Sequence, residues 1–179
     1  YDGYYVLGND IDASNYVHGS KNYGGDSFNN AKWENNPNNY TDAAIGLKGT
    51  FNGMGYSING LTIGSQYEGL FGVVNGGTVK NVAFMNVKSD YKDGGNKYVL
   101  GYYLIGATIE NIHIETNAYD ATDVTNNPGF AMKNSALLAY YAPSYNDVKT
   151  VIANTVLIYS TVNPATANTS GGRCGIAFN

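Results

Sequence analysis

Residues 69–84 read GLFGVVNGGTVKNVAF, and a similar stretch, FNGMGYSINGLTI, precedes them at residues 51–63. Both contain short apolar runs with alternating residues that end at glycine or asparagine, the pattern of β-strands closed by tight turns. Helix signals are nearly absent, because no window keeps apolar residues at helical spacing and glycine, asparagine and β-branched residues recur throughout. The sequence therefore predicts an all-β fold.

One strand pattern recurs along the chain: an aliphatic residue, a spacer, Asn or Gly, and then alternating aliphatic residues. It is found in SINGLTI (57–63), TVKNVAF (78–84), TIENIHI (108–114) and VIANTVLI (151–158), and a Gly-rich or Tyr-rich strand precedes the last three. Repeated strands with connections of variable length indicate a parallel β-solenoid. The alternative is an antiparallel sandwich, which has no reason to repeat the same strand pair in order.

In such a solenoid the inward-facing aliphatic residues would stack into one continuous core. We expect this core to contain Ile58, Leu61, Ile63, Leu70, Val79, Val82, Ile109, Ile112, Ile114 and Ile152. The repeat also places Asn81, Asn111 and Asn154 at one position of successive coils. Stacked asparagines can hydrogen-bond to one another and to turn backbone, so we interpret these three as a structural ladder.

The stretches YYVLGNDIDAS (4–14), LKGTFNGMGYSINGLTI (47–63) and GLFGVVNGGTVKNV (69–82) follow one another in the order of a known motif. Together they resemble the GLUG-motif and related right-handed β-helix segments of bacterial surface and secreted proteins. The resemblance implies a right-handed parallel β-helix of about four to five irregular coils within a longer adhesin-like protein. It indicates fold more strongly than function, because such segments serve as scaffolds in several kinds of protein. The corner FNGMG has Asn52 where the family usually has an acidic residue.

Composition narrows the classes of function. The net charge is −4 and the ten basic residues are scattered, which argues against nucleic-acid binding. No apolar stretch is long enough to cross a membrane. Abundant Tyr (17) and Gly (23) with few charged residues (13%) are typical of extracellular or cell-surface proteins. We expect one domain over residues 1–179 in that location.

Polysaccharide lyases and glycosidases also use right-handed β-helices, so acidic residues near strand ends need consideration. Asp10 and Asp12 lie two residues apart and could hold Ca²⁺, although capping of turn amides explains them as well. Glu110 and Glu115 are five apart, which on a regular strand places them on opposite faces. His113 should point outward without a metal partner. We therefore expect no catalytic residue and no cofactor, with an enzyme as the third alternative.

Ligand binding has better candidates in a long inserted loop. Residues 15–44 interrupt the motif and carry Trp33, Tyr23 and Tyr40. Aromatic rings stack on sugars and amides bond to hydroxyl groups, and binding residues are commonly placed on loops of a rigid scaffold. The loop aromatics could also simply pack the loop against the helix. The loop nevertheless makes a glycan or another host or cell-surface ligand the leading partner.

A second set of candidates comes from two Tyr-Tyr pairs in corresponding strands of consecutive coils. We expect one tyrosine of each pair to face outward, and we choose Tyr103 and Tyr141. The leading prediction is a non-catalytic adhesion or glycan-binding module. The alternative is a structural, self-assembling module, because open solenoid ends are sheet edges that neighbouring domains or other copies can cover.

Overall fold

The computed structural model of the chain describes residues 1–18, 46–64, 69–89, 98–120, 129–130, 135–142, 147–162, 173–174 and 176. All regular structure in these ranges is β-strand. Every strand pair is parallel, which confirms the all-β prediction and contradicts the antiparallel sandwich. None of the described residues forms a helix that could cross a membrane.

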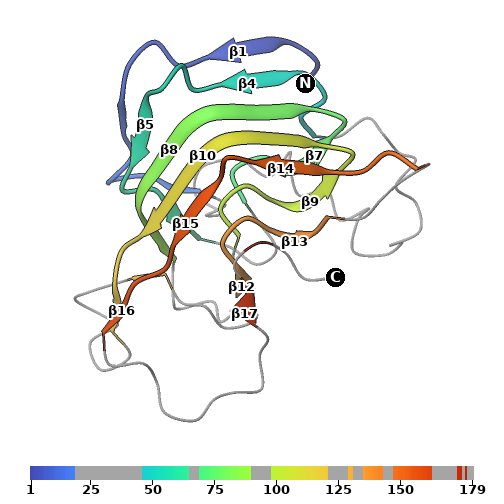
Figure 1. The fold of residues 1–179 in the computed structure, drawn as a ribbon. Coiled ribbons are helices and arrows are strands. Elements are labelled where there is room, and N and C mark those ends of the chain that lie inside the picture. Colours follow the sequence, from blue (N-terminus) through green and yellow to red (C-terminus); the bar gives the residue numbers. More distant parts are fainter. Residues whose placement is uncertain are drawn as a thin grey trace.

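The largest sheet contains ten strands, and its central path has the order β1-β4-β8-β10-β14 (Figure 1). The strands of this path are β1 (Tyr4–Val6), β4 (Thr50–Asn52), β8 (Thr78–Ser89), β10 (Thr108–Thr116) and β14 (Val151–Ala153). The other strands of the sheet are β2 (Ile11–Asp12), β3 (Val17–His18), β5 (Ser57–Asn59), β6 (Thr62–Ile63) and β15 (Val156–Ile158). Strand order follows sequence order, so each segment of the chain adds one layer.

Three smaller sheets repeat this order. A three-stranded sheet pairs β13 (Ala139–Tyr141), β9 (Gly101–Ile105) and β7 (Gly72–Asn75). Two further pairs join β11 (Tyr119–Asp120) to β16 (Thr161–Val162) and β12 (Ser135–Ala136) to β17 (Arg173–Cys174). An isolated bridge connects Leu47 to Val74 of β7, which extends the three-stranded sheet by one layer. The predicted recurrence of a strand pair along the chain is therefore observed.

The core consists of rows of side chains that run across the layers. One row joins Tyr5, Phe51, Val79, Ile109 and Ile152, and a second joins Ile11, Ile58, Phe84, Ile114 and Leu157. Eight of the ten predicted core residues are buried, and Leu70 and Ile152 are partly buried against the core. Each row is buried in its inner layers and becomes exposed toward the ends of the stack.

The long strands turn at asparagines with left-handed backbone. Asn81, Asn111 and Asn154 have φ values of 54°, 53° and 48°. A left-handed residue bends the chain and resets the alternation of side chains along the strand. Glu110 and Glu115 consequently both lie on the outer surface, on either side of Asn111, since Ile109, Ile112 and Ile114 are all buried. The predicted placement of these carboxylates on opposite faces is wrong for this reason.

Candidate functional site

The tyrosines predicted to bind ligand have different outcomes. Tyr103 of β9 and Tyr141 of β13 are paired in register, as the repeat predicts. Tyr103 is only 4% exposed, because it pairs with the buried Val73 and paired residues of parallel strands face the same side. The outward position expected for Tyr103 is thus corrected, and its ring is not available for stacking on a ligand.

The remaining binding candidates lie outside the described residues. This applies to Trp33, Tyr23 and Tyr40 of the inserted loop, and to the side chain of Tyr141. The two ends of that loop are described. Val17 pairs with Thr62, and Leu47 bridges to Val74, so the loop leaves and rejoins the stack at fixed positions.

The two aspartates considered for a cation are engaged by serines. The amide and the hydroxyl of Ser57 donate to Oδ1 of Asp10 at 2.7 and 2.9 Å, and these hydrogen bonds lower the pKa of Asp10. The hydroxyl and the amide of Ser14 lower the pKa of Asp12 in the same way, and the amide bond is 2.9 Å long. Within the described ranges, no group of three or more His, Cys, Asp or Glu side chains could hold a metal ion. Asp12 therefore caps a turn amide as suggested, whereas Asp10 binds the first residue of the neighbouring strand β5.

The predicted asparagine ladder exists, but it begins one layer earlier than expected. Asn111 donates to Asn81 at 2.9 Å, and Asn81 donates to Asn52 at 3.0 Å. Asn52 is 6% exposed, donates to the hydroxyl of Tyr4 at 2.7 Å and accepts the amide of Met54 at 3.0 Å. The hydrogen-bonded ladder thus runs from the Asn52 turn to Asn111, and Asn154 shares only its left-handed backbone.

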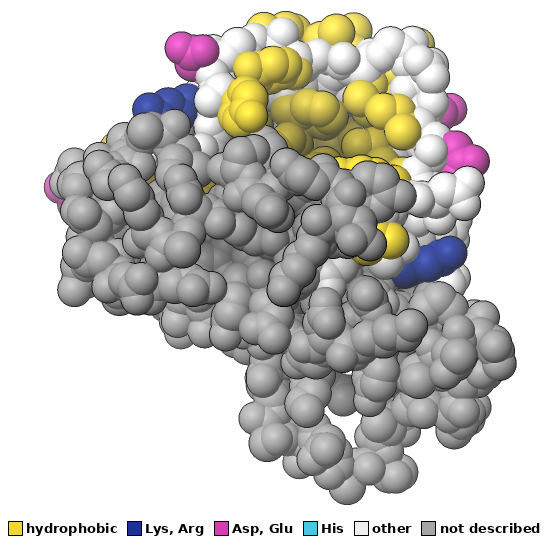
Figure 2. Space-filling view, turned by 180° about the vertical axis from the view of Figure 1, so that it is seen from behind, with side chains coloured by type: hydrophobic (Ala, Val, Ile, Leu, Met, Phe, Trp, Pro, Cys, Tyr) yellow, Lys and Arg dark blue, Asp and Glu magenta, His cyan; other side chains and the backbone are white. Residues whose placement is uncertain are grey.

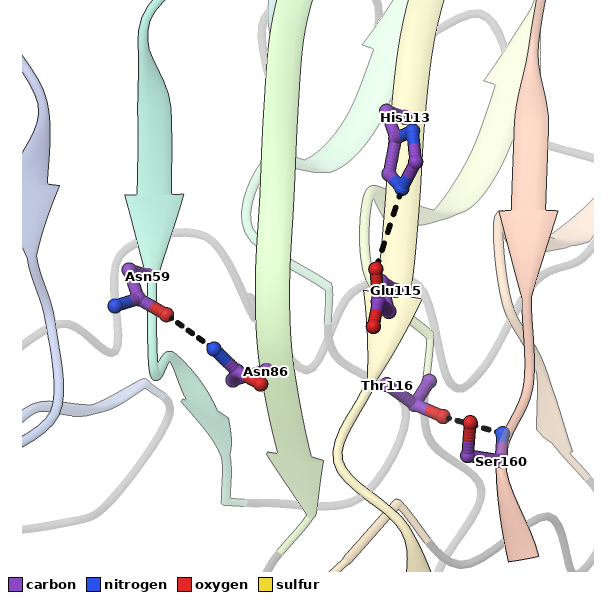
Figure 3. A network of polar contacts seen from close by, with 6 residues as sticks. All are labelled: Asn59, Asn86, His113, Glu115, Thr116 and Ser160. Atoms are coloured by element: carbon purple, nitrogen blue, oxygen red, sulfur yellow. Dashed lines mark hydrogen bonds and ion pairs between the residues drawn. The ribbon is translucent and has the colours of Figure 1, made fainter.

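A second set of polar contacts lies on the next flank of the sheet (Figure 3). Asn86 donates to Asn59 at 2.8 Å, which links β8 to β5. Nε2 of His113 lies 3.6 Å from Oε2 of Glu115 on the same strand, and both side chains are partly exposed. Nε2 of His113 makes no hydrogen bond to a described residue, and one histidine beside one glutamate does not form a nucleophile or metal constellation. His113 points outward, as predicted.

The sequence predicts open sheet ends without naming the residues that form them, and in the structure one such end is the exposed strand β1. Within the described residues β1 pairs with β4 alone, so the other side of β1 is an open edge. All three of its residues are exposed, with Tyr4 at 63% and Val6 at 53%. The ring of Tyr5 packs edge-to-face against Tyr1 at 6.5 Å, and Ile11 of the adjoining strand β2 is also exposed. We call β1 and β2 the N-terminal edge.

The opposite end of the sheet has a matching apolar edge formed by β14 and β15, which we call the C-terminal edge. Its exposed residues include Val151 (52%), Val156 (50%) and Ile158.

In space-filling view, hydrophobic side chains gather in a hollow at the end of the molecule where β1 and β4 lie (Figure 2). Open apolar strand edges are unusual, because they readily pair with other strands.

Comparisons of the chain with protein-family models, curated proteins and solved structures found no match. The class that the geometry defines is an all-β protein with a largely parallel sheet, whose two apolar edges are not covered by any described strand.

Proposed function

We propose that the chain is a right-handed parallel β-helix module with a structural role in an extracellular or cell-surface protein. Its end strands are covered by β-strands of neighbouring molecules or modules. Uninterrupted parallel register from β1 to β14 supports the coiled path, and the GLUG-like motifs support the hand. The asparagine ladder supports a scaffold, because it ties three successive corners together, from Asn52 through Asn81 to Asn111.

The observation that carries this proposal is the composition of β1. Natural edge strands are protected by charged residues, proline, bulges or a covering segment. The three residues of β1 are Tyr4, Tyr5 and Val6, and all of them are exposed. Burying apolar surface contributes roughly 25 cal/mol per Å², so a strand added to this edge gains both backbone hydrogen bonds and apolar burial.

Edge pairing can be tested by introducing charge at the edge. We expect concentration-dependent association of the wild-type chain in sedimentation velocity, and its loss in the variant Tyr4→Lys/Val6→Lys. The matched control is Thr78→Lys, which adds the same side chain in the row of Tyr4 but on the inner strand β8. A wild-type chain that stays monomeric at every concentration would contradict the proposal.

A second function, glycan or surface-ligand binding by the inserted loop, is favoured by the fixed loop ends. Val17 and Leu47 are held by neighbouring layers, so the scaffold presents the loop from a defined base. A glycan array should show binding that is lost in Trp33→Ala. It should be kept in Tyr56→Ala, which removes an exposed tyrosine from a different turn. Absence of binding to any glycan would reject this second function.

A further inference from the structure

We propose that the strand covering each edge comes from a second copy of this chain, stacked head to tail. In this arrangement β1 of one copy extends the sheet of its neighbour beyond β14, in parallel. The inference rests on the structural function proposed above and specifies its partner, direction and register.

The register across the layers supports a copy as the occupant. Tyr4, Thr50, Thr78, Thr108 and Val151 form one continuous row, with Tyr4 and Val151 at its two ends. Translation along the stack therefore places Tyr4 of one copy beside Val151 of the next. It likewise brings the ends of the two core rows together, Tyr5 against Ile152 and Ile11 against Leu157. Both core rows would then continue without a polar interruption.

The two faces of the stack are offset by one layer in a way that fits this translation. Among the described residues, the face of β1 has five layers, in the order β1-β4-β8-β10-β14. The opposite face begins one segment later, at Leu47, and continues through β7, β9 and β13. It also ends one segment later, because the amide of Ala139 donates to the carbonyl of Ile176 and β12 pairs with β17.

Among the described residues, the stack therefore has a half-layer at each end. The C-terminal half-layer consists of β17 and Ile176, and no described strand of the β1 face lies beside it. The N-terminal half-layer consists of β1, β2 and β3, and no described strand of the Leu47 face lies beside it. Joined head to tail, the described strands of the two half-layers complement each other and form one layer. A partner of unrelated structure has no reason to match this offset.

Charges at the two ends agree with the same direction. Asp2 lies two residues before Tyr4, and Lys149 lies two residues before Val151, the residue at the other end of the same row. Both side chains are exposed, and they carry opposite charges. The five facing pairs of the strands themselves contain no two like charges. A two-fold arrangement of N-terminal edges would instead gather Asp2, Asp10 and Asp12 from both copies, and like-charge contacts are unfavourable at interfaces. Head-to-tail contacts do not close, so the expected product is a linear polymer.

Cysteine cross-linking tests the register directly, in a Cys174→Ser background. Adjacent strands lie about 4.8 Å apart, within the range of Cα separations of disulfides. We expect a mixture of a Tyr4→Cys copy and a size-tagged Val151→Cys copy to give a mixed disulfide dimer under mild oxidation. A chain with both substitutions should give a series of multimers on a non-reducing gel. The control is Thr78→Cys, which belongs to the same row on an inner strand and should not cross-link to Val151→Cys.

Charge reversal gives a second test that needs no cysteine. Lys149→Glu should weaken association at low salt, and Asp2→Lys in the same chain should restore it. Cross-linking of Tyr4→Cys to itself would overturn the head-to-tail inference and leave edge pairing in place. A chain that is monomeric in sedimentation and forms no cross-link in any mixture would overturn both this inference and the proposed structural function.

Discussion

The side-chain amide of Asn111 donates a 2.9 Å hydrogen bond to Oδ1 of Asn81, and both residues turn the chain with left-handed backbone, at φ 53° and 54°. Asparagine tolerates this conformation better than most residues, since its short polar side chain can bond locally. Here that side chain bonds along the stack instead. At Asn81 and Asn111 the same residue therefore turns the corner and ties it to the preceding layer.

Substitutions of Asn81 should separate these two roles. Asn81→Gly removes the bonds to Asn52 and Asn111 but keeps the left-handed turn free of strain, so we expect a loss of about 1–3 kcal/mol. Asn81→Ala removes the same bonds and adds a left-handed alanine, at a further cost of about 1 kcal/mol. Urea unfolding of the two variants measures the difference. Equal stability of the alanine and glycine variants would contradict a role for backbone conformation at this corner.

Gly53 should be intolerant of any side chain because of its neighbour in the next layer. A Cβ atom at Gly53 would lie 2.5 Å from the carbonyl oxygen of Asn81 and would also collide with Val82. We expect Gly53→Ala to destabilise the fold by more than about 2 kcal/mol, as overpacking of a rigid contact does. Gly8→Ala is the control, because no atom lies within 4 Å of its added Cβ. A Gly53→Ala chain with the Tm of the wild type would show that the two layers lie further apart than the structure places them.

Phe84 should contribute most of the stability of its core row. It is fully buried between Ile58 of one layer and Ile114 of the next. Phe84→Ala leaves a cavity and should cost about 3–5 kcal/mol, whereas Phe84→Leu should cost clearly less. The free energy of unfolding in urea tests both values. Similar losses in the two variants would contradict a cost set by the size of the cavity.

Much of the fold could be predicted from the sequence because one strand pattern repeats. The repeat requires Val79, Ile109 and Ile152 to occupy equivalent places, and the structure aligns them in one row. The register of Tyr103 with Tyr141 follows from the same repeat. The direction of the Tyr103 side chain does not follow from the repeat. The register shifts between Gly72 and Val73, whereas reading the pattern assumes that side chains alternate without interruption.

The start of the ladder was missed for a related reason. Asn52 belongs to a longer turn, FNGMG, so it does not align with Asn81 by counting along the repeat. Asn52, at a corner position that is usually acidic in the motif the chain resembles, was a usable signal, since an amide, unlike a carboxylate, can both donate to Tyr4 and accept from Asn81. The exposed edges could be anticipated only as open ends. The repeat did carry a signal for them, because Tyr4 and Val151 occupy a row position that is threonine in every inner layer.

The hydrogen bonds to Asp10 should make stability depend on pH in a defined direction. The amide of Ser57, followed by its hydroxyl, lowers the pKa of Asp10 below its ordinary value of 3.8 in the folded chain. The carboxylate of Asp10 therefore binds a proton more readily in the unfolded chain than in the folded chain. The stabilisation that ionised Asp10 gives to the fold is complete above about pH 4 and is lost as the pH falls through the lower pKa of the folded chain. Asp10→Asn should lower the Tm slightly, by an amount that is constant between about pH 5 and pH 7 and shrinks below about pH 3. Thermal unfolding followed by circular dichroism at several pH values measures this difference, with Ser57→Ala as a companion that removes the hydroxyl donor and keeps the amide. A difference between wild type and Asp10→Asn that stays undiminished at the lowest pH would show that the serine contacts do not favour the ionised carboxylate.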